Sequence, residues 1–161
     1  MNVQEVLNDP IAQELLASTE LARLAYTWKD GSPRVVPIWF HWNGSEVVLA
    51  SPRMAPKLKV LQDRPQVALT IDSSGAWPYH VLLLRGTARV EMAEDVPAEY
   101  AAAADRYFGP VQGAAWLDNV NQMGLKFARI VVTPAYARIL DFDTRFPSAI
   151  EQAMQEAQPA Q

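Results

Sequence analysis

The run Ser51-Pro52-Arg53-Met54-Ala55-Pro56-Lys57-Leu58-Lys59 holds the side chains best suited to chemistry. Three cations fall within seven residues, where an apolar strand ends and a short helix is expected to begin. The first N–H groups of a helix lack intrahelical partners, and serine, arginine and lysine side chains bind phosphate oxygens. We predict that Lys57 binds a phosphate group, assisted by Ser51 and Arg53, with Lys59 nearby. The alternative is a solvated basic helix face.

A second candidate is the apolar run Arg34-Val35-Val36-Pro37-Ile38-Trp39. Proline inside a strand leaves one ladder position without a donor. The strand is therefore expected at a sheet edge, at a bulge, or where a ligand replaces a neighbouring strand. One apolar face can meet the core while the other meets a partner subunit or a flat aromatic ligand; a buried strand with a proline bulge is the alternative. Among the five tryptophans, Trp39 and Trp77 are placed where a pocket can form.

Several function classes have no support in the sequence. With no cysteine, the chain has no thiol nucleophile and no disulfide. His41 and His80 lack acidic or histidine partners at metal-ligand spacing, and glycine-rich nucleotide-binding or nucleophile-elbow motifs are absent. The net charge of −4 argues against a nucleic-acid binder. We therefore expect no metal, no catalytic side chain and no essential histidine.

The start of the chain and its hydropathy bear on localisation. MNVQEVLNDP lacks the basic and apolar regions of a secretory signal. No stretch approaches the roughly 18 apolar residues that span a bilayer. A cytoplasmic protein is expected.

These segments require a mainly β scaffold to position them. Strands are predicted over 19–28, 34–42, 47–50, 66–71, 80–91 with a bend at Gly86, 126–133 and 135–142. Helices are predicted over 2–18 with a break at Asp9-Pro10, within 51–64, over 95–108 with Asp95 as N-cap, and from about 147. Residues 111–125 are ambiguous. Asn43-Gly44 is a hairpin signal.

About seven strands linked as consecutive hairpins avoid exposed edges by closing into a barrel. The predicted fold class is mainly β: one domain over 1–161, a β-barrel with a few helices. Its core covers about 19–142, and terminal helices cover 2–18 and 147–157.

The order of these segments resembles the pyridoxamine 5'-phosphate oxidase-like split β-barrel family, which includes FMN enzymes and reductases that use a deazaflavin, factor 420. The resemblance lies in LARLAYTWKDGSPRVVPIWFHWNGSEVVLASPRMAPKLKVLQDRPQVALTI and YHVLLLRGTARVE, about residues 20–91. The closing run ARIVVTPAYARILDF resembles the family more weakly.

The resemblance implies where a cofactor binds. The strand that contains Arg34, Val36, Pro37, Ile38 and Trp39 lies along the isoalloxazine edge. Ser51 and Lys57 bind the phosphate, and the strand around Arg85 lies near a dimer interface that completes the site. The oxidases carry Ser-Arg before the phosphate-binding lysine, where this chain has Ala55-Pro56, and a basic C-terminal segment that it lacks. These departures favour the deazaflavin branch.

The implied function is hydride transfer through FMN or a deazaflavin to a small molecule, in a homodimer. The apolar runs 34–42 and 81–84 also favour a dimer, since one small barrel cannot bury both. Two alternatives are a non-catalytic barrel that binds or senses flavin or haem, and a dimer with a vestigial pocket.

Overall fold

The computed structural model describes residues 2–75 and 77–157. Its helices there are α1 (Val3–Leu7), α2 (Pro10–Ala17), α3 (Lys57–Asp63), α4 (Ala98–Phe108), α5 (Pro110–Gln122) and α6 (Ser148–Glu156). Its strands are β1 (Ala22–Thr27), β2 (Pro33–Ile38), β3 (Phe40–Trp42), β4 (Val47–Pro52), β5 (Gln66–Asp72), β6 (Val81–Met92) and β7 (Phe127–Leu140).

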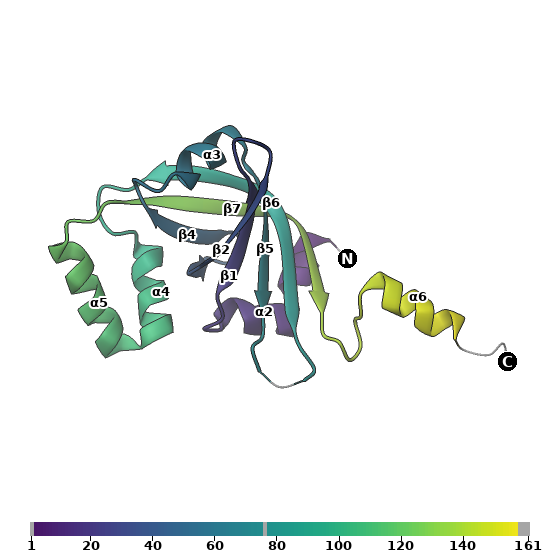
Figure 1. Ribbon diagram of the computed structural model, residues 1–161. Coiled ribbons are helices and arrows are strands. Elements are labelled where there is room, and N and C mark those ends of the chain that lie inside the picture. Colours follow the sequence, from purple (N-terminus) through teal and green to yellow (C-terminus); the bar gives the residue numbers. More distant parts are fainter. Residues whose placement is uncertain (1, 76, 158–161) are drawn as a thin grey trace.

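The strands form one antiparallel sheet in the order β2-β1-β5-β6-β7-β4-β3. Its two edge strands, β2 and β3, are consecutive in the chain and separated only by Trp39. The backbone itself therefore joins the two edges and curls the sheet into a split barrel (Figure 1). The mainly β barrel predicted from the sequence is confirmed.

The barrel core follows the two-residue alternation of the strands. In β5, Val67, Leu69 and Ile71 are buried while their neighbours are half-buried or exposed. Leu24, Leu84 and other inward side chains from the remaining strands join them. Apolar residues of α1 and α2 complete this core, and each fully buried aliphatic side chain contributes about 1.5–3 kcal/mol.

The predicted break at Asp9-Pro10 is confirmed, because Asp9 caps α2 and Pro10 is its first residue. A capping box of Asn2 and Glu5 starts α1. The prediction that Asp95 caps the helix over 95–108 is wrong. That helix begins at Ala98, since Pro97 has an extended ψ of 139° and ends the loop before it.

Three further boundaries differ from the sequence prediction. The single strand over 34–42 is two strands, because the chain turns a barrel corner at Trp39. The two strands over 126–142 are one, β7. Pro134 fits inside it opposite Gly86, at a register shift between β6 and β7 that leaves Ala135 unpaired in the ladder. The ambiguous segment 111–125 contains α5, with Pro110 in its first turn, where a missing N–H costs nothing.

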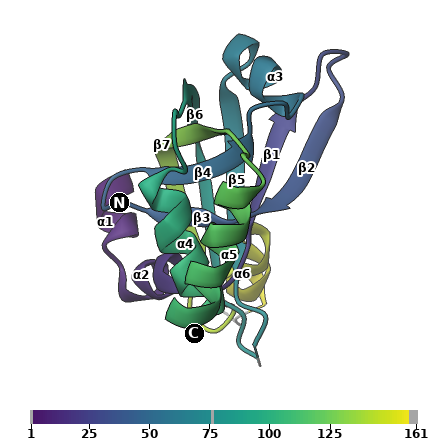
Figure 2. The same cartoon turned by 90° about the vertical axis from the view of Figure 1, so that its left-hand side faces the viewer.

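Two helical elements extend beyond the barrel. The hairpin of α4 and α5 stands at one side, and α6 projects from the opposite side (Figures 1 and 2).

The turn before α6 is fixed by the Asp141 carboxylate, which accepts hydrogen bonds from the backbone of Asp143, Thr144 and Arg145. Burial raises the Asp141 pKa, but the hydrogen bond from the Thr144 hydroxyl and these backbone bonds outweigh it and lower the pKa to about 2. No helix in the described part of the chain is long and apolar enough to cross a membrane.

The close approach of β6 and β7 at Gly86 predicts that adding one methyl group there strongly destabilises the fold. A Cβ at Gly86 would lie 2.1 Å from the carbonyl oxygen of Thr133, so Gly86→Ala must separate the strands. We expect a loss of at least about 1–3 kcal/mol of unfolding free energy, as for overpacked cores, measured by urea denaturation. Gly75→Ala is the matched control because a Cβ there meets no atom within 4 Å. Equal stability of the two variants would contradict this close approach of β6 and β7.

Candidate functional site

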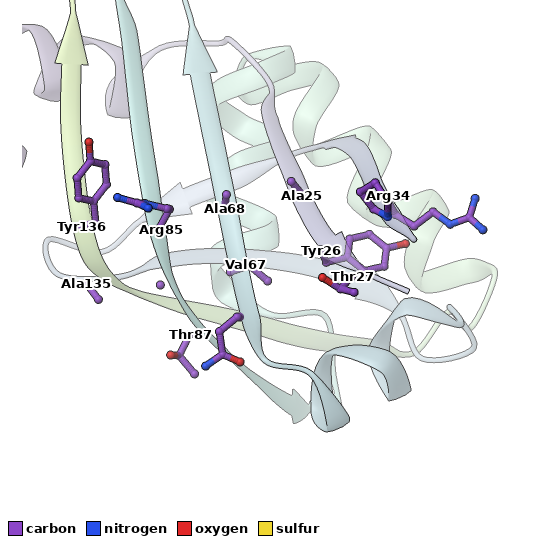
Figure 3. A pocket seen from close by; sticks show the side chains of 13 residues that line it. Ala25, Tyr26, Thr27, Arg34, Val67, Ala68, Arg85, Thr87, Ala135 and Tyr136 are labelled. Atoms are coloured by element: carbon purple, nitrogen blue, oxygen red, sulfur yellow. The ribbon is translucent and has the colours of Figure 1, made fainter. Parts of the chain in front are cut away.

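A groove of about 590 Å³ lies on the outer face of the sheet, across β1, β2, β5, β6 and β7. It is lined by Ala25, Tyr26, Thr27, Pro33, Arg34, Gln66, Val67, Ala68, Arg85, Gly86, Thr87, Ala135 and Tyr136 (Figure 3). Its volume lies within the usual range of small-molecule and cofactor pockets, roughly 300–1,000 Å³.

The register of the strands explains why the sheet is hollow here. Ala25 pairs with Ala68, Ala68 with Arg85, and Arg85 with Tyr136, so these residues form one row across four strands. Directly paired residues in neighbouring strands present their side chains on the same face. Two adjacent alanines therefore leave a shallow floor, and the larger Arg85 and Tyr136 form a wall beside it.

The groove is positively charged although the whole chain is acidic. Its lining includes Arg34 and Arg85 and no carboxylate, whereas the chain has a net charge of −4. The Arg85 guanidinium lies 3.8 Å from the centre of the Tyr136 ring, and the Arg34 guanidinium lies 5.6 Å from that of Trp28. Neither arginine pairs with an acidic side chain within residues 2–75 and 77–157. The arrangement suits an anionic ligand with a flat apolar part.

Lys57 is the first residue of α3, and its side chain is half-buried. Its ammonium has no hydrogen-bond or ion-pair partner in the described part of the chain, and burial lowers its pKa below the usual 10.5. It does not line the groove; α3 leads directly into β5, whose first residue, Gln66, does. A half-buried cation without a counter-ion is stabilised by an anion. Lys59, two residues on, is exposed.

Ser51, one of the expected phosphate ligands, lies near the end of β4. Its side chain is buried, and its hydroxyl has no hydrogen-bond partner within the described residues. Arg53 is also committed elsewhere, since its guanidinium donates to the backbone carbonyls of Ala93 and Phe127. Ser51 is therefore out of reach of solvent, and Arg53 links the end of β4 to the first residue of β7 and to the segment that follows β6.

The remaining predicted cofactor residues fall into two places. Val36, Pro37 and Ile38 lie on β2, whose outer edge pairs with no strand of the described residues, and Pro37 is exposed there. Trp39 instead packs among Tyr100, Tyr107, Phe108 and Trp116 beneath the α4–α5 hairpin.

Trp77 lies in the loop after β5, against Tyr79 and Phe142. None of these five residues lines the groove.

The histidines do not converge on the groove. His41, on β3, has a lowered pKa because of burial first and the charge of Arg106 second. His80 precedes β6, and its backbone N–H donates to Ser73 Oγ. Within the described ranges, no three histidine or acidic residues are grouped so that they can hold a metal ion.

Sequence reasoning missed Tyr136 and the alanine floor. Arg85 and Tyr136 are neighbours only because β6 and β7 pair, and the α4–α5 hairpin separates them in the chain. Small residues at alternate positions of β1 and β5 were the available signal. They could not be assigned to a shared face until the register was known.

Comparison with known proteins gives the family. The model of the pyridoxamine 5'-phosphate oxidase family matches residues 9–140. No curated protein matches. Among solved structures, an F420 reductase is 26% identical, with 78% of this chain and 94% of that chain covered and a TM-score of 0.61.

Two more distant structures share the fold. A conserved hypothetical protein of Mycobacterium tuberculosis is 20% identical, with 89% of this chain and 86% of that chain covered and a TM-score of 0.68. The haem storage protein HutZ of Vibrio cholerae is 17% identical, with 83% and 93% covered and a TM-score of 0.54. The family match covers most of the chain, including every strand. The chain belongs to the pyridoxamine 5'-phosphate oxidase family.

Proposed function

We propose that this protein is an oxidoreductase that binds a flavin nucleotide, FMN or the deazaflavin factor 420, in the outer groove between two copies of the chain. The observation that carries the proposal is a groove that holds two arginines and no carboxylate, on an acidic protein. Cofactors of this class combine a flat ring system with an anionic phosphate chain. The groove supplies a partner for each part.

The floor and the walls of the groove bind different parts of the cofactor. Ala25 and Ala68 leave room for a ring system to approach the sheet closely. Arg85 and Arg34 provide charges for phosphate or carboxylate oxygens. Lys57 provides a further cation from the start of α3, the helix that precedes β5. The open edge of β2 offers backbone donors and acceptors to the ring edge.

The chemistry requires little more of the protein. A bound flavin or deazaflavin supplies the hydride transfer itself. The residues of the groove hold and orient the ring, and the sheet shields one of its faces from water. No side chain of the groove is a histidine, aspartate or glutamate, so we assign no acid–base role and no catalytic residue.

The comparisons support this reading to different degrees. The F420 reductase is the relative whose name states a deazaflavin activity, and the family match itself implies flavin chemistry. The haem storage protein shares the fold alone at 17% identity. The alternative is haem or flavin storage. A storage protein binds its ligand without turnover, so a haem titration and an assay of cofactor-dependent turnover distinguish it from an oxidoreductase.

The second copy of the chain is part of the proposal. The outer face presents Leu83 half-buried and Val35 with 64% of its surface exposed. Both are apolar and lie beside the groove on β6 and β2. An isologous dimer would cover them and enclose the cofactor.

The first prediction from this proposal concerns cofactor affinity. Lys57→Ala should weaken binding of FMN or factor 420 by roughly ten- to a hundredfold, since a hydrogen bond to a charged group contributes about 1.5–3 kcal/mol. Isothermal titration calorimetry of both cofactors against wild type and variant measures this. Lys126→Ala is the control for loss of one positive charge, because Lys126 is exposed and donates only to the Glu94 carbonyl. Equal losses in the two variants would place the phosphate elsewhere.

The second prediction concerns the protonation of Lys57. Its ammonium should titrate below pH 10.5 in the free protein, because burial disfavours the charged form. A bound phosphate should raise that midpoint, since an adjacent anion favours the charged form. NMR titration of the lysine Cε signals with and without cofactor measures both values. A midpoint that the cofactor does not move would argue against contact with phosphate.

The third prediction concerns the dimer. Wild type should sediment with twice the 17.9 kDa mass of the chain at micromolar concentration. Leu83→Arg should convert it to monomer, because a charge on the covered face must be desolvated without a partner. Val111→Arg is the control, since Val111 is 82% exposed on α5 and away from that face. A wild-type monomer, or a dimer unaffected by Leu83→Arg, would refute this interface.

A further inference from the structure

A second cleft lies on the opposite side of the barrel from α6, beneath the α4–α5 hairpin. Its volume is about 330 Å³, and it is lined by Trp39, Ala50, Pro52, Tyr100, Trp116, Val120, Leu125 and Phe127. None of these residues lines the outer groove, and none carries a charge. The cleft is therefore a separate and uncharged environment.

Aromatic rings make up much of its wall. The ring centroid of Trp39 lies 5.6 Å from that of Tyr100 and 6.4 Å from that of Trp116. Tyr107 stacks on Trp39 at 5.0 Å with an interplanar angle of 14°, which fixes the indole in place. Rings held at these distances present flat faces and edges, and other aromatic rings pack against such surfaces with favourable geometry.

One polar group of the cleft has unused hydrogen-bonding capacity. The Trp116 Nε1–H donates to Tyr100 Oη at 2.9 Å. The Tyr100 hydroxyl can also donate its own proton, and no residue in the described part of the chain accepts it. The cleft thus offers one hydrogen-bond donor among apolar rings.

The helix that covers the cleft is supported mainly by its neighbour helix. Gly113 of α5 approaches α4 so closely that a Cβ there would lie 2.9 Å from the carbonyl oxygen of Ala104. Gly109 and Gly124 bracket α5 with positive φ angles of 79° and 62°. Because α5 packs on α4 rather than on the sheet, space remains between α5 and the barrel.

We propose that this cleft binds a flat, uncharged aromatic molecule of about two fused rings that carries a hydrogen-bond acceptor, which the Tyr100 hydroxyl recognises. The volume lies at the lower end of ligand pockets and so favours a small ligand. The lack of charged lining residues disfavours an ion, because an unpaired charge would be desolvated there. The proposal does not depend on the cofactor groove, since the two sites share no residue.

Three naphthalene probes test the proposal on the protein without cofactor. 1-Acetylnaphthalene carries an acceptor, 1-ethylnaphthalene has similar size without one, and 1-naphthoate carries a charge. Binding is followed by the NMR signals of the Trp116 indole N–H and the Val120 methyls, which belong to the cleft. We expect saturable shifts, with affinity highest for 1-acetylnaphthalene, lower for 1-ethylnaphthalene and lowest for 1-naphthoate. The acetyl probe should bind roughly two- to tenfold more tightly than the ethyl probe, because one neutral hydrogen bond contributes that much.

Two variants and one control distinguish specific binding in the cleft from nonspecific hydrophobic binding. Tyr100→Phe should abolish the preference for the acetyl probe and leave the ethyl probe unchanged. Ala50→Leu should fill the cleft and weaken both probes, whereas Ala114→Leu, on the exposed side of α5, should weaken neither.

Four results would overturn the proposal: no saturable shift at Trp116, shifts confined to Leu83 and Ala68 of the outer face, equal affinity for the acetyl and ethyl probes in wild type, or an unchanged preference in Tyr100→Phe. The wild-type and Tyr100→Phe measurements decide the matter even if Ala50→Leu fails to fold.

Discussion

The chain crosses from one edge of the sheet to the other between Ile38 and Phe40, and the rest of the molecule depends on that corner. Joining the edges covalently fixes how strongly the sheet curls, and hence which strands lie side by side on its outer face. Trp39 stands at the corner and packs against rings from both α4 and α5. The same residue therefore closes the barrel and anchors the helical hairpin. At a barrel corner one residue makes no strand-pairing hydrogen bonds. A large aromatic side chain offsets that loss by burying its surface.

Curvature and register together create the outer groove. The long β6–β7 pair shifts register at Arg85 and Gly86, where the backbone of Thr133 passes too close for any Cβ. The shift places Arg85 opposite Tyr136 and leaves the two alanines of β1 and β5 beside them. Irregularities of this kind re-aim side chains next to functional sites. In this protein the irregularity sets a cation at the rim of an apolar floor.

Charge is distributed unevenly over this acidic protein. Carboxylates gather on the side of α4, where Arg129 bonds both Glu91 and Glu99, and in the turn before α6, where Asp141 binds backbone N–H groups. These carboxylates are satisfied inside the structure. Within the described residues, the arginines of the groove and Lys57 have no acidic partner, and they can pair with an anion. The net charge of −4 therefore does not reveal the positively charged groove.

Sequence alone determined the local features, which depend on near neighbours. The alternation of apolar residues predicted the strands, Asn43-Gly44 the hairpin, and Asp9-Pro10 the helix break. The order of these elements was also enough to indicate the barrel family. Where a feature depended on contacts between distant segments, the sequence could not decide it. The burial of Ser51, the commitment of Arg53 to carbonyls more than thirty residues away in the chain, and the turn at Trp39 all follow from strand pairing.

The site itself was the clearest case of this division. Ala25, Ala68, Arg85 and Tyr136 share a row only because four strands align in one register, and nothing local in any of the four segments specifies that alignment. A shift of one residue in any pair would move its side chains to the other face of the sheet. The sequence determined which side chains exist and how each strand alternates. Tertiary structure decided which of them meet, because register is selected by burial of the whole core rather than by the residues that line the groove.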